Sequence, residues 1–381
     1  MKKANYKKIF SVILTMLSLI IVQSAWSDEH TAEQTRPIQL GTSGGNVNDS
    51  SRAFCCGGTL GALVQDANKK YILSNNHVLA KTNQGISGDD IIQPGLIDQN
   101  PVCSKDYSNG VADLTSFVSI SFMKGTTNTV DAAIAEVRSN CIGSLGYTVN
   151  CVDPLGSILD IGQVSNSTVT TPTFNMPVKK SGRTTGQTTG TITATNVTVD
   201  IRYNKQCGIG SQKARFINQI MIGPAGFSAG GDSGSLIVEN CSQYPRVVGL
   251  LFAGSSTSTL ANPISDVLSL LGVSMVGSSL TPCSSSTSTG VSLMTAQSQL
   301  PPQANHRAVE AVSKVKERHE EAILRIEGVV GIGIGLSDTE PGQVVIEVYT
   351  KRPVHEMKHL IPEALEGIPV KIVETGEIVA Y

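Results

Sequence analysis

Hydrophobic positions between residues 31 and 277 occur in short runs that Gly, Asn and Pro interrupt. The clearest runs are GTLGALV (58–64), LTSFVSI (114–120), DAAIAEV (131–137) and GTITATNVTV (190–199). Short strands between frequent turns are typical of β-barrels and β-sandwiches. The pattern therefore predicts an all-β domain over 31–277. One closing helix is expected at 264–272, where apolar residues recur at helical spacing before a glycine.

The pattern changes after this domain. Residues 278–304 are rich in Ser and Thr and low in charge, which predicts a linker. Residues 305–381 are rich in charge, and their periodicity predicts a small α+β domain. We expect helices at 307–326 and 354–366 and strands at 329–336, 343–350 and 368–373. Its role is not evident from the sequence; stabilisation, or docking to a partner or to the β domain, is the expected use.

The first 27 residues have the pattern of a signal peptide. A basic start precedes the apolar run IFSVILTMLSLIIV (9–22), and Ala25-Trp26-Ser27 resembles a cleavage site. No second run is long enough to cross a bilayer, so no membrane partner is expected after cleavage. The net charge of −2 gives no reason to expect nucleic-acid binding. We therefore expect a secreted or periplasmic protein.

All eight cysteines follow the predicted signal peptide. An even number of cysteines in an exported chain favours disulfides over buried free thiols. The sequence does not decide among the possible pairings. No Cys-x-x-Cys spacing is present, so a zinc ribbon is not indicated.

Candidate chemistry centres on three residues of the β domain. His77, in YILSNNHVLA (71–80), is the only histidine between residues 31 and 305 and hence the only imidazole available as a general base there. Ser233 lies in FSAGGDSGSLIV (227–238), where glycines leave the backbone free to form a tight turn around a nucleophile. Asp131 opens an apolar run, where a carboxylate is costly unless its charge is used. Asp113, in VADLTSFV, is the alternative acid. A lone histidine at a strand end is also compatible with a structural role.

In their order along the chain, these segments resemble the chymotrypsin-like serine proteases. CGGTLGALV followed by YILSNNHVL is similar to the strand and histidine loop of that family, and VDAAIAEV and GGDSGSLIV are similar to its Asp and Ser segments. KSGRTTGQTTGTITATNVTV (180–199) is similar to a run of bacterial α-lytic-type proteases. The resemblance covers residues 31–277. It implies two antiparallel β-barrels with the active site between them, and a triad of His77, Asp131 and Ser233.

The resemblance also implies how the serine loop works. The backbone N–H groups of Gly231 and Ser233 would form an oxyanion hole. In trypsin-like zymogens a newly released N-terminus pairs with the Asp before the Ser. Here the resemblance implies that Arg183 of the SGRTTG run forms an ion pair with Asp232 instead.

The substrate pocket would include Phe227, Ser228 and Gly254. No acid stands at the position that binds Arg or Lys in trypsin-like enzymes, so apolar or small residues are expected before the scissile bond. Phe252 replaces the usual Ser of the substrate-binding strand, and Val78 replaces the usual Cys after the histidine. These departures leave the backbone pairing of the substrate and the partner of Cys56 open.

Rival interpretations remain. A protease-fold binding module that does not cleave, and an esterase with the same triad, are the alternatives to an endopeptidase. His355-Glu356-Met357-Lys358-His359 matches the zinc-protease motif H-E-x-x-H, but Pro353 and Pro362 confine any helix there to about two turns. No metal or organic cofactor is expected, and the expected partner is a protein or peptide substrate.

Overall fold

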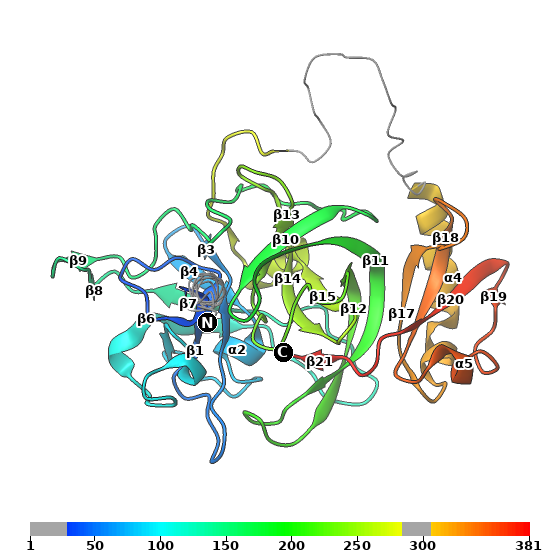
Figure 1. Cartoon of the computed structure of the whole chain (residues 1–381), viewed down its shortest axis with the longest axis horizontal. Coiled ribbons are helices and arrows are strands. Elements are labelled where there is room, and N and C mark those ends of the chain that lie inside the picture. The colour runs from blue at the N-terminus through cyan, green and yellow to red at the C-terminus, as the bar shows by residue number, and fades with distance from the viewer. Residues whose placement is uncertain (1–28, 284–305) are drawn as a thin grey trace, which may run out of the picture.

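The computed structural model describes residues 29–283 and 306–381 (Figure 1). The predicted signal peptide, and the predicted linker beyond residue 283, lie outside the described residues. Within the described part, no helix has the length and apolar character needed to cross a membrane.

The first barrel is an antiparallel sheet built from the N-terminal strands. These are β1 (Thr42–Asn46), β2 (Gly58–Leu60), β3 (Ala62–Gln65), β4 (Lys70–Ser74), β5 (Asp90–Ile92), β6 (Gly110–Phe117), β7 (Ala133–Val137) and the late strand β16 (Ser274–Met275). The sheet order is β16-β3-β4-β7-β6-β5-β1-β2. Only Gly61 separates β2 from β3, so one bent segment supplies strands near both ends of the sheet and closes it. A Cβ at Gly61 would collide with the carbonyl oxygen of Gly234, so this bend also brings the two barrels into contact.

The second barrel is closed by hydrogen bonding around its circumference. Its strands are β10 (Pro177–Gly182), β11 (Gly186–Tyr203), β12 (Gln212–Gly223), β13 (Leu236–Glu239), β14 (Val247–Gly254) and β15 (Thr259–Pro263). They pair in the order β10-β13-β14-β15-β12-β11, and β11 pairs back with β10. Leu236, Val247 and Leu250 of this barrel belong to the same apolar core as the strands of the first barrel. The all-β, two-barrel prediction is therefore confirmed.

Short elements connect and close the barrels. They are α2 (Asn76–Leu79), the 3-10 turns η1 (Leu96–Asp98) and η2 (Tyr107–Asn109), the hairpin β8 (Cys141–Ile142) and β9 (Thr148–Val149), and α3 (Ile264–Leu271). The helix α3 is the predicted closing helix. It ends at Leu271 and is capped by Gly272, whose φ of 67° is the left-handed conformation that favours glycine at a helix C-terminus.

The C-terminal residues form the α+β unit that periodicity predicts. It contains α4 (His306–Leu324), β17 (Val329–Leu336), β18 (Val344–Thr350), α5 (Val354–Met357), β19 (Ala364–Leu365), β20 (Ile368–Glu374) and β21 (Val379–Ala380). The helix expected at 354–366 is much shorter than predicted, because a turn and β19 replace its second half. Val312, Val315 and Ile323 of α4 pack on one face of the sheet, against Ile332 and Ile346.

This C-terminal sheet continues the second barrel without a break (Figure 1). The strand β17 pairs antiparallel with β11, with Thr198 opposite Ile332 and Thr195 opposite Ile334. Glycines make the close approach possible, since a Cβ at Gly333 would lie 2.9 Å from Val197 Cγ2. The glycines of β17 therefore serve close strand packing.

Four disulfides join all eight cysteines: Cys55–Cys103, Cys56–Cys207, Cys141–Cys151 and Cys241–Cys283. The expectation of disulfides is confirmed, and the partner of Cys56 is Cys207. Cys56 lies between β1 and β2, and Cys207 lies in the turn between β11 and β12, so this bond joins the two barrels.

Removing the Cys56–Cys207 bond should destabilise the protein more than removing Cys141–Cys151. The sequence separations are 151 and 10 residues, and a longer loop loses more chain entropy when it is closed. The Cys56→Ser/Cys207→Ser protein should therefore lose about 2 kcal/mol more unfolding free energy than Cys141→Ser/Cys151→Ser. Equilibrium urea unfolding followed by circular dichroism measures both. Equal losses, or a larger loss for the shorter loop, would contradict this role.

Candidate active site

Asp131 and His77 lie together at the edge of the first barrel. Asp131 lies two residues before β7, and His77 lies in α2, which follows β4 after one residue. The Asp131 carboxylate is fully buried, and its Oδ2 lies 2.6 Å from His77 Nδ1. Its Oδ1 accepts a second hydrogen bond from the His77 amide at 3.2 Å. The carboxylate therefore fixes both the ring and the backbone of His77.

Two asparagines hold the backbone of Asp131. Asn75 Nδ2 donates to the Asp131 carbonyl at 2.7 Å, and the Asp131 amide donates to Asn262 Oδ1 at 3.0 Å. Asn75 comes from the first barrel and Asn262 from β15 of the second, so both barrels position this residue.

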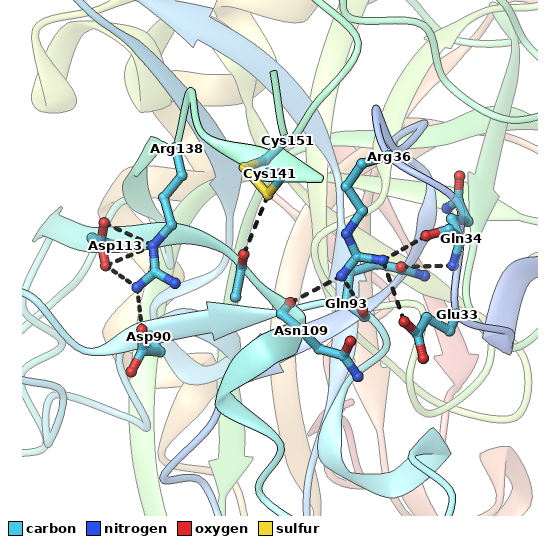
Figure 2. Close-up of a disulfide and its surroundings, with 11 residues drawn as sticks. Glu33, Gln34, Arg36, Asp90, Gln93, Asn109, Asp113, Arg138, Cys141 and Cys151 are labelled. Carbon is cyan, nitrogen blue, oxygen red and sulfur yellow. Dashed lines mark hydrogen bonds and ion pairs between the residues drawn. A yellow bond between two sulfur atoms is a disulfide. The ribbon is translucent and has the colours of Figure 1, made fainter. Parts of the chain in front are cut away.

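The alternative acid, Asp113, lies elsewhere. It belongs to β6, and its half-exposed carboxylate binds the guanidinium of Arg138 together with Asp90 (Figure 2). This group lies near the Cys141–Cys151 disulfide, as Figure 2 shows. Of the two candidate acids, only Asp131 contacts His77 in the described part of the chain.

Tyr203 is a member of this site that the sequence analysis missed. It ends β11 in the second barrel, is buried, and donates from its hydroxyl to Asp131 Oδ2 at 2.8 Å. Its ring meets the His77 ring edge-on at 5.9 Å between centroids. Burial and the charge of Asp131 both raise the pKa of Tyr203 well above 10, so the phenol stays protonated and keeps donating. A tyrosine at the end of a strand gives no sequence signal for this role.

The pKa of His77 reflects opposing effects. Burial lowers it, but the charge of Asp131, the Asp131 hydrogen bond and the hydrogen bond with Tyr381 together raise it above 6.5. Protonated His77 is therefore favoured over a wider pH range than in a free histidine.

Ser233 lies in the turn between β12 and β13, and its carbonyl accepts from the Thr59 amide of the first barrel at 2.8 Å. Its side chain is fully buried, and its Oγ donates to the Phe252 carbonyl at 3.1 Å. Among the described residues no hydrogen bond joins Ser233 to His77. Instead, His77 Nε2 lies 2.9 Å from the carbonyl oxygen of Tyr381, and the Tyr381 amide lies 3.5 Å from the Phe252 carbonyl that Ser233 also contacts. Tyr381 thus contacts His77 directly and approaches the same carbonyl as Ser233.

The predicted oxyanion residues adopt a turn that requires glycine. Gly231 has a φ of 99° and Gly234 a φ of 93°, both in the region that side chains disfavour. Thr59 Oγ1 donates to the Gly231 carbonyl at 3.0 Å and so links this turn to the first barrel. Asp232, between Gly231 and Ser233, is fully buried, so its carboxylate does not lie on the surface of the turn.

The predicted ion pair between Arg183 and Asp232 is wrong. Arg183 binds Asp98 instead, with Nε and Nη2 each 2.6 Å from a different carboxylate oxygen. The cation that pairs with Asp232 is the buried Lys180, whose Nζ lies 3.4 Å from Oδ2. The strand β10 ends at Gly182, so Lys180 still points into the barrel while Arg183 has left the strand and reaches toward η1.

Asp232 also receives four hydrogen bonds. The amides of Thr184, Thr185 and Ala229 donate at 2.9, 3.1 and 2.9 Å, and Thr185 Oγ1 donates at 2.7 Å. The SGRTTG run therefore does hold Asp232, but through its threonines and not through its arginine. Burial lowers the pKa of Lys180, and the charge of Asp232 opposes that effect.

The three predicted pocket residues lie around Tyr381. A Cβ on Gly254 would collide with its hydroxyl, and Phe227 belongs to the apolar cluster against which its ring packs. Ser228 Oγ lies 2.5 Å from Thr259 Oγ1 on the wall of the second barrel. Phe252 takes part through its backbone carbonyl, which accepts from Ser233 Oγ and is approached by the Tyr381 amide, so this contact does not depend on the side chain at position 252.

The H-E-x-x-H segment does not form a zinc-protease helix. The helix α5 ends at Met357, before His359, and both histidines are exposed. Glu356 accepts from Arg352 Nε at 2.9 Å.

Comparisons with known proteins return distant structural likenesses. No family model and no curated protein matches the sequence. Similar solved structures include Thermobifida fusca Protease A, at 18% identity and a TM-score of 0.40, covering 63% of this chain and 99% of that one. A glutamic-acid-specific serine protease is 21% identical, with a TM-score of 0.38; the match covers 62% of this chain and 100% of that one. Cellulomonas bogoriensis chymotrypsin is 18% identical, with a TM-score of 0.38; the match covers 63% of this chain and 99% of that one.

At these identities and TM-scores the likenesses carry no argument about activity. The barrel topology is what defines the class: the chain has the fold of chymotrypsin-like serine proteases, extended by a C-terminal α+β unit.

Replacing Tyr203 by Phe should change the electrostatic interaction between Asp131 and His77 while keeping the packing of the aromatic ring. The Asp131 carboxylate would lose a donor, so more of its charge would act on His77 and the pKa of His77 should rise further. Titration of the His77 ring protons by NMR measures this shift. Tyr349→Phe is the matched control, because Tyr349 is equally buried but donates to Glu347 in the C-terminal unit. An unchanged His77 titration in Tyr203→Phe would contradict a positioning role.

Replacing Lys180 by Met should destabilise the protein more than replacing Arg183 by Met. Lys180 and Asp232 are both fully buried, whereas the Arg183 side chain is 15% exposed. Removing one partner of a buried ion pair typically costs ~3–5 kcal/mol, because the other charge is left uncompensated. Chemical denaturation of both variants tests the order. If Arg183→Met lost more unfolding free energy than Lys180→Met, the result would contradict the assignment of Lys180 as the stabilising cation.

Proposed function

We propose that this chain is an exported serine endopeptidase that hydrolyses peptide bonds through Ser233, His77 and Asp131. The observation that carries the proposal is the buried Asp131 carboxylate 2.6 Å from His77 Nδ1. Tyr381 contacts both His77 and the Phe252 carbonyl that accepts from Ser233 Oγ, which supports placing the three residues in one site. A buried carboxylate, an oriented imidazole and a hydroxyl on a tight turn are the parts of a nucleophilic triad.

Each residue has a distinct part in the proposed reaction. Ser233 Oγ attacks the peptide carbonyl carbon while His77 Nε2 takes the hydroxyl proton. His77 then gives that proton to the leaving amine as the C–N bond breaks, and water repeats the sequence on the acyl-enzyme. Asp131 keeps the proton of His77 on Nδ1 and stabilises the imidazolium. The amides of Gly231 and Ser233 would stabilise the oxyanion.

The proposed cellular setting follows from the cysteines and the N-terminal pattern. Four disulfides favour an oxidising compartment, which suits a secreted or periplasmic protein. The expected partner is a protein or peptide substrate.

A binding module without cleavage is the second candidate, and the contact between Tyr381 and His77 favours it. A peptide-like segment already lies where a substrate would react. An esterase with the same triad is the third, and nothing in the site favours an ester over an amide.

Substitutions in the triad test the proposal against both alternatives. Ser233→Ala, His77→Ala and Asp131→Asn should each lower kcat/KM on a peptide substrate by roughly 10⁴-fold or more, because the three residues act as a unit. Asp113→Asn is the matched control and should keep its activity. The measurement is hydrolysis of paired peptide and ester substrates by each variant, with circular dichroism to verify folding.

Two results would decide against an endopeptidase. Hydrolysis of esters alone would identify an esterase. A folded protein that binds peptides but turns over neither substrate, even after residues 379–381 are removed, would identify a binding module.

A further inference from the structure

The last residues of the sequence return from the C-terminal unit to the two barrels (Figure 1). The strand β21 (Val379–Ala380) pairs in parallel with β11 at Arg202 and antiparallel with β14 at Ala253 and Gly254. No periodicity in the sequence predicts this strand. It lies between two strands of the second barrel, with Tyr381 directly after it.

The backbone of this segment lies along β14 as a bound peptide would. Ala380 is opposite Ala253, Val379 is opposite Gly254, and the Tyr381 amide approaches the Phe252 carbonyl. Main-chain pairing with an exposed strand is a general way to bind an extended peptide. The Tyr381 carbonyl oxygen lies 2.9 Å from His77 Nε2. In the proposed reaction this nitrogen takes the proton of Ser233 and gives it to the leaving amine.

This contact fixes the protonation of His77. A carbonyl oxygen can only accept, so Nε2 must carry a proton, and Nδ1 must carry one to reach the Asp131 carboxylate at 2.6 Å. His77 is therefore an imidazolium in this arrangement. An imidazolium cannot take the proton of Ser233, so the arrangement is inactive.

The side chain of Tyr381 fills the pocket beside the serine loop. Its hydroxyl donates to the Ser255 carbonyl at 3.0 Å, and its ring packs against the apolar cluster that contains Phe227 and Leu251. The glycine at position 254 leaves the space that the phenol occupies. An aromatic ring with one hydroxyl therefore matches both the apolar wall and the polar end of the pocket.

The segment is held in place by residues on its N-terminal side. Ile378 is 1% exposed within the core shared by β11 and the C-terminal unit, and its carbonyl accepts from the Arg202 amide at 3.0 Å. Glu377 binds Arg202 Nε at 2.9 Å. A ligand tethered this closely has an effective concentration of the order of millimolar, so even a weak peptide keeps the site filled.

We propose that residues 379–381 are an intramolecular ligand of the substrate groove, and that Tyr381 marks the primary pocket as one for aromatic side chains. The segment inhibits the enzyme until it is displaced or removed, and substrates with Tyr or Phe before the scissile bond are preferred. This inference rests on the proposed endopeptidase function for its kinetic consequences, but peptide binding tests it independently.

The kinetic test compares the full chain with a variant lacking residues 379–381. The substrate is acetyl-Ile-Val-Ala-Tyr-aminomethylcoumarin, which copies residues 378–381. If the tethered segment is present at ~1 mM and binds with a Kd of ~0.1 mM, its removal should raise kcat/KM about 10-fold. Tyr381→Ala should give part of this gain, and Tyr147→Ala, which removes an exposed tyrosine of the β8–β9 hairpin, should give none. The same substrate with Arg in place of Tyr should be hydrolysed at least 10-fold less efficiently by the shortened protein.

The binding test needs no catalysis. In the Ser233→Ala background, a fluorescent acetyl-Ile-Val-Ala-Tyr peptide should bind the protein lacking residues 379–381 at least 10-fold more tightly than the full chain, by fluorescence anisotropy. Equal binding to both proteins, or equal kcat/KM in an active pair, would overturn the inference and leave the endopeptidase proposal intact. Tighter peptide binding by the shortened protein without turnover in either would support the segment as a ligand and overturn the endopeptidase proposal.

Discussion

The buried charge of Asp131 is the constraint on which the rest of the site depends. An unpaired carboxylate in a protein interior is costly, so the surrounding structure must supply donors and a cation. His77 supplies its ring and its amide from the first barrel, and Tyr203 supplies a hydroxyl from the second. Satisfying one carboxylate therefore requires both barrels to be docked. The Cys56–Cys207 disulfide makes a covalent link between them near the same place.

A second buried carboxylate, that of Asp232 in the serine loop, has the same need for donors and a cation. Asp232 is compensated by Lys180 and by donors from Thr184, Thr185 and Ala229, all within the chain. Because β10, the turn that follows it and Ala229 of the loop itself supply these groups, the loop needs no newly released N-terminus to take up its shape. The proposed enzyme would then be controlled not by completion of this loop but by what occupies the groove in front of it.

The sequence predicted those features that local pattern controls. Short apolar runs and turn residues predicted the all-β domain and the α+β unit, and the family resemblance implied the two barrels. The apolar run after Asp131 favoured it over Asp113. In the structure Asp131 contacts His77, whereas Asp113 lies with Arg138. Lys180 and Arg183 show the limit of this approach. They lie three residues apart in one run, and only the end of β10 at Gly182 decides which side chain faces Asp232.

The contacts between distant strands could not be predicted from the sequence for a different reason. Tyr203 and Tyr381 join the site because distant strands meet there, and neither carries a local signal. The strand β21 pairs with β14, and β17 of the same C-terminal unit pairs with β11. Both are backbone interactions that side-chain pattern does not encode. The residues that the sequence missed are thus those that reach His77 from β11 and from the C-terminal unit.

Covalent labelling is the measurement that tests the catalytic claim most directly. A fluorophosphonate reacts with a serine hydroxyl only where a base removes its proton and donors stabilise the oxyanion. In the protein lacking residues 379–381, mass spectrometry of proteolytic fragments should find one adduct, on Ser233, and none when His77 is replaced by Ala. A folded protein without an adduct, or with the adduct on another serine, would contradict the account.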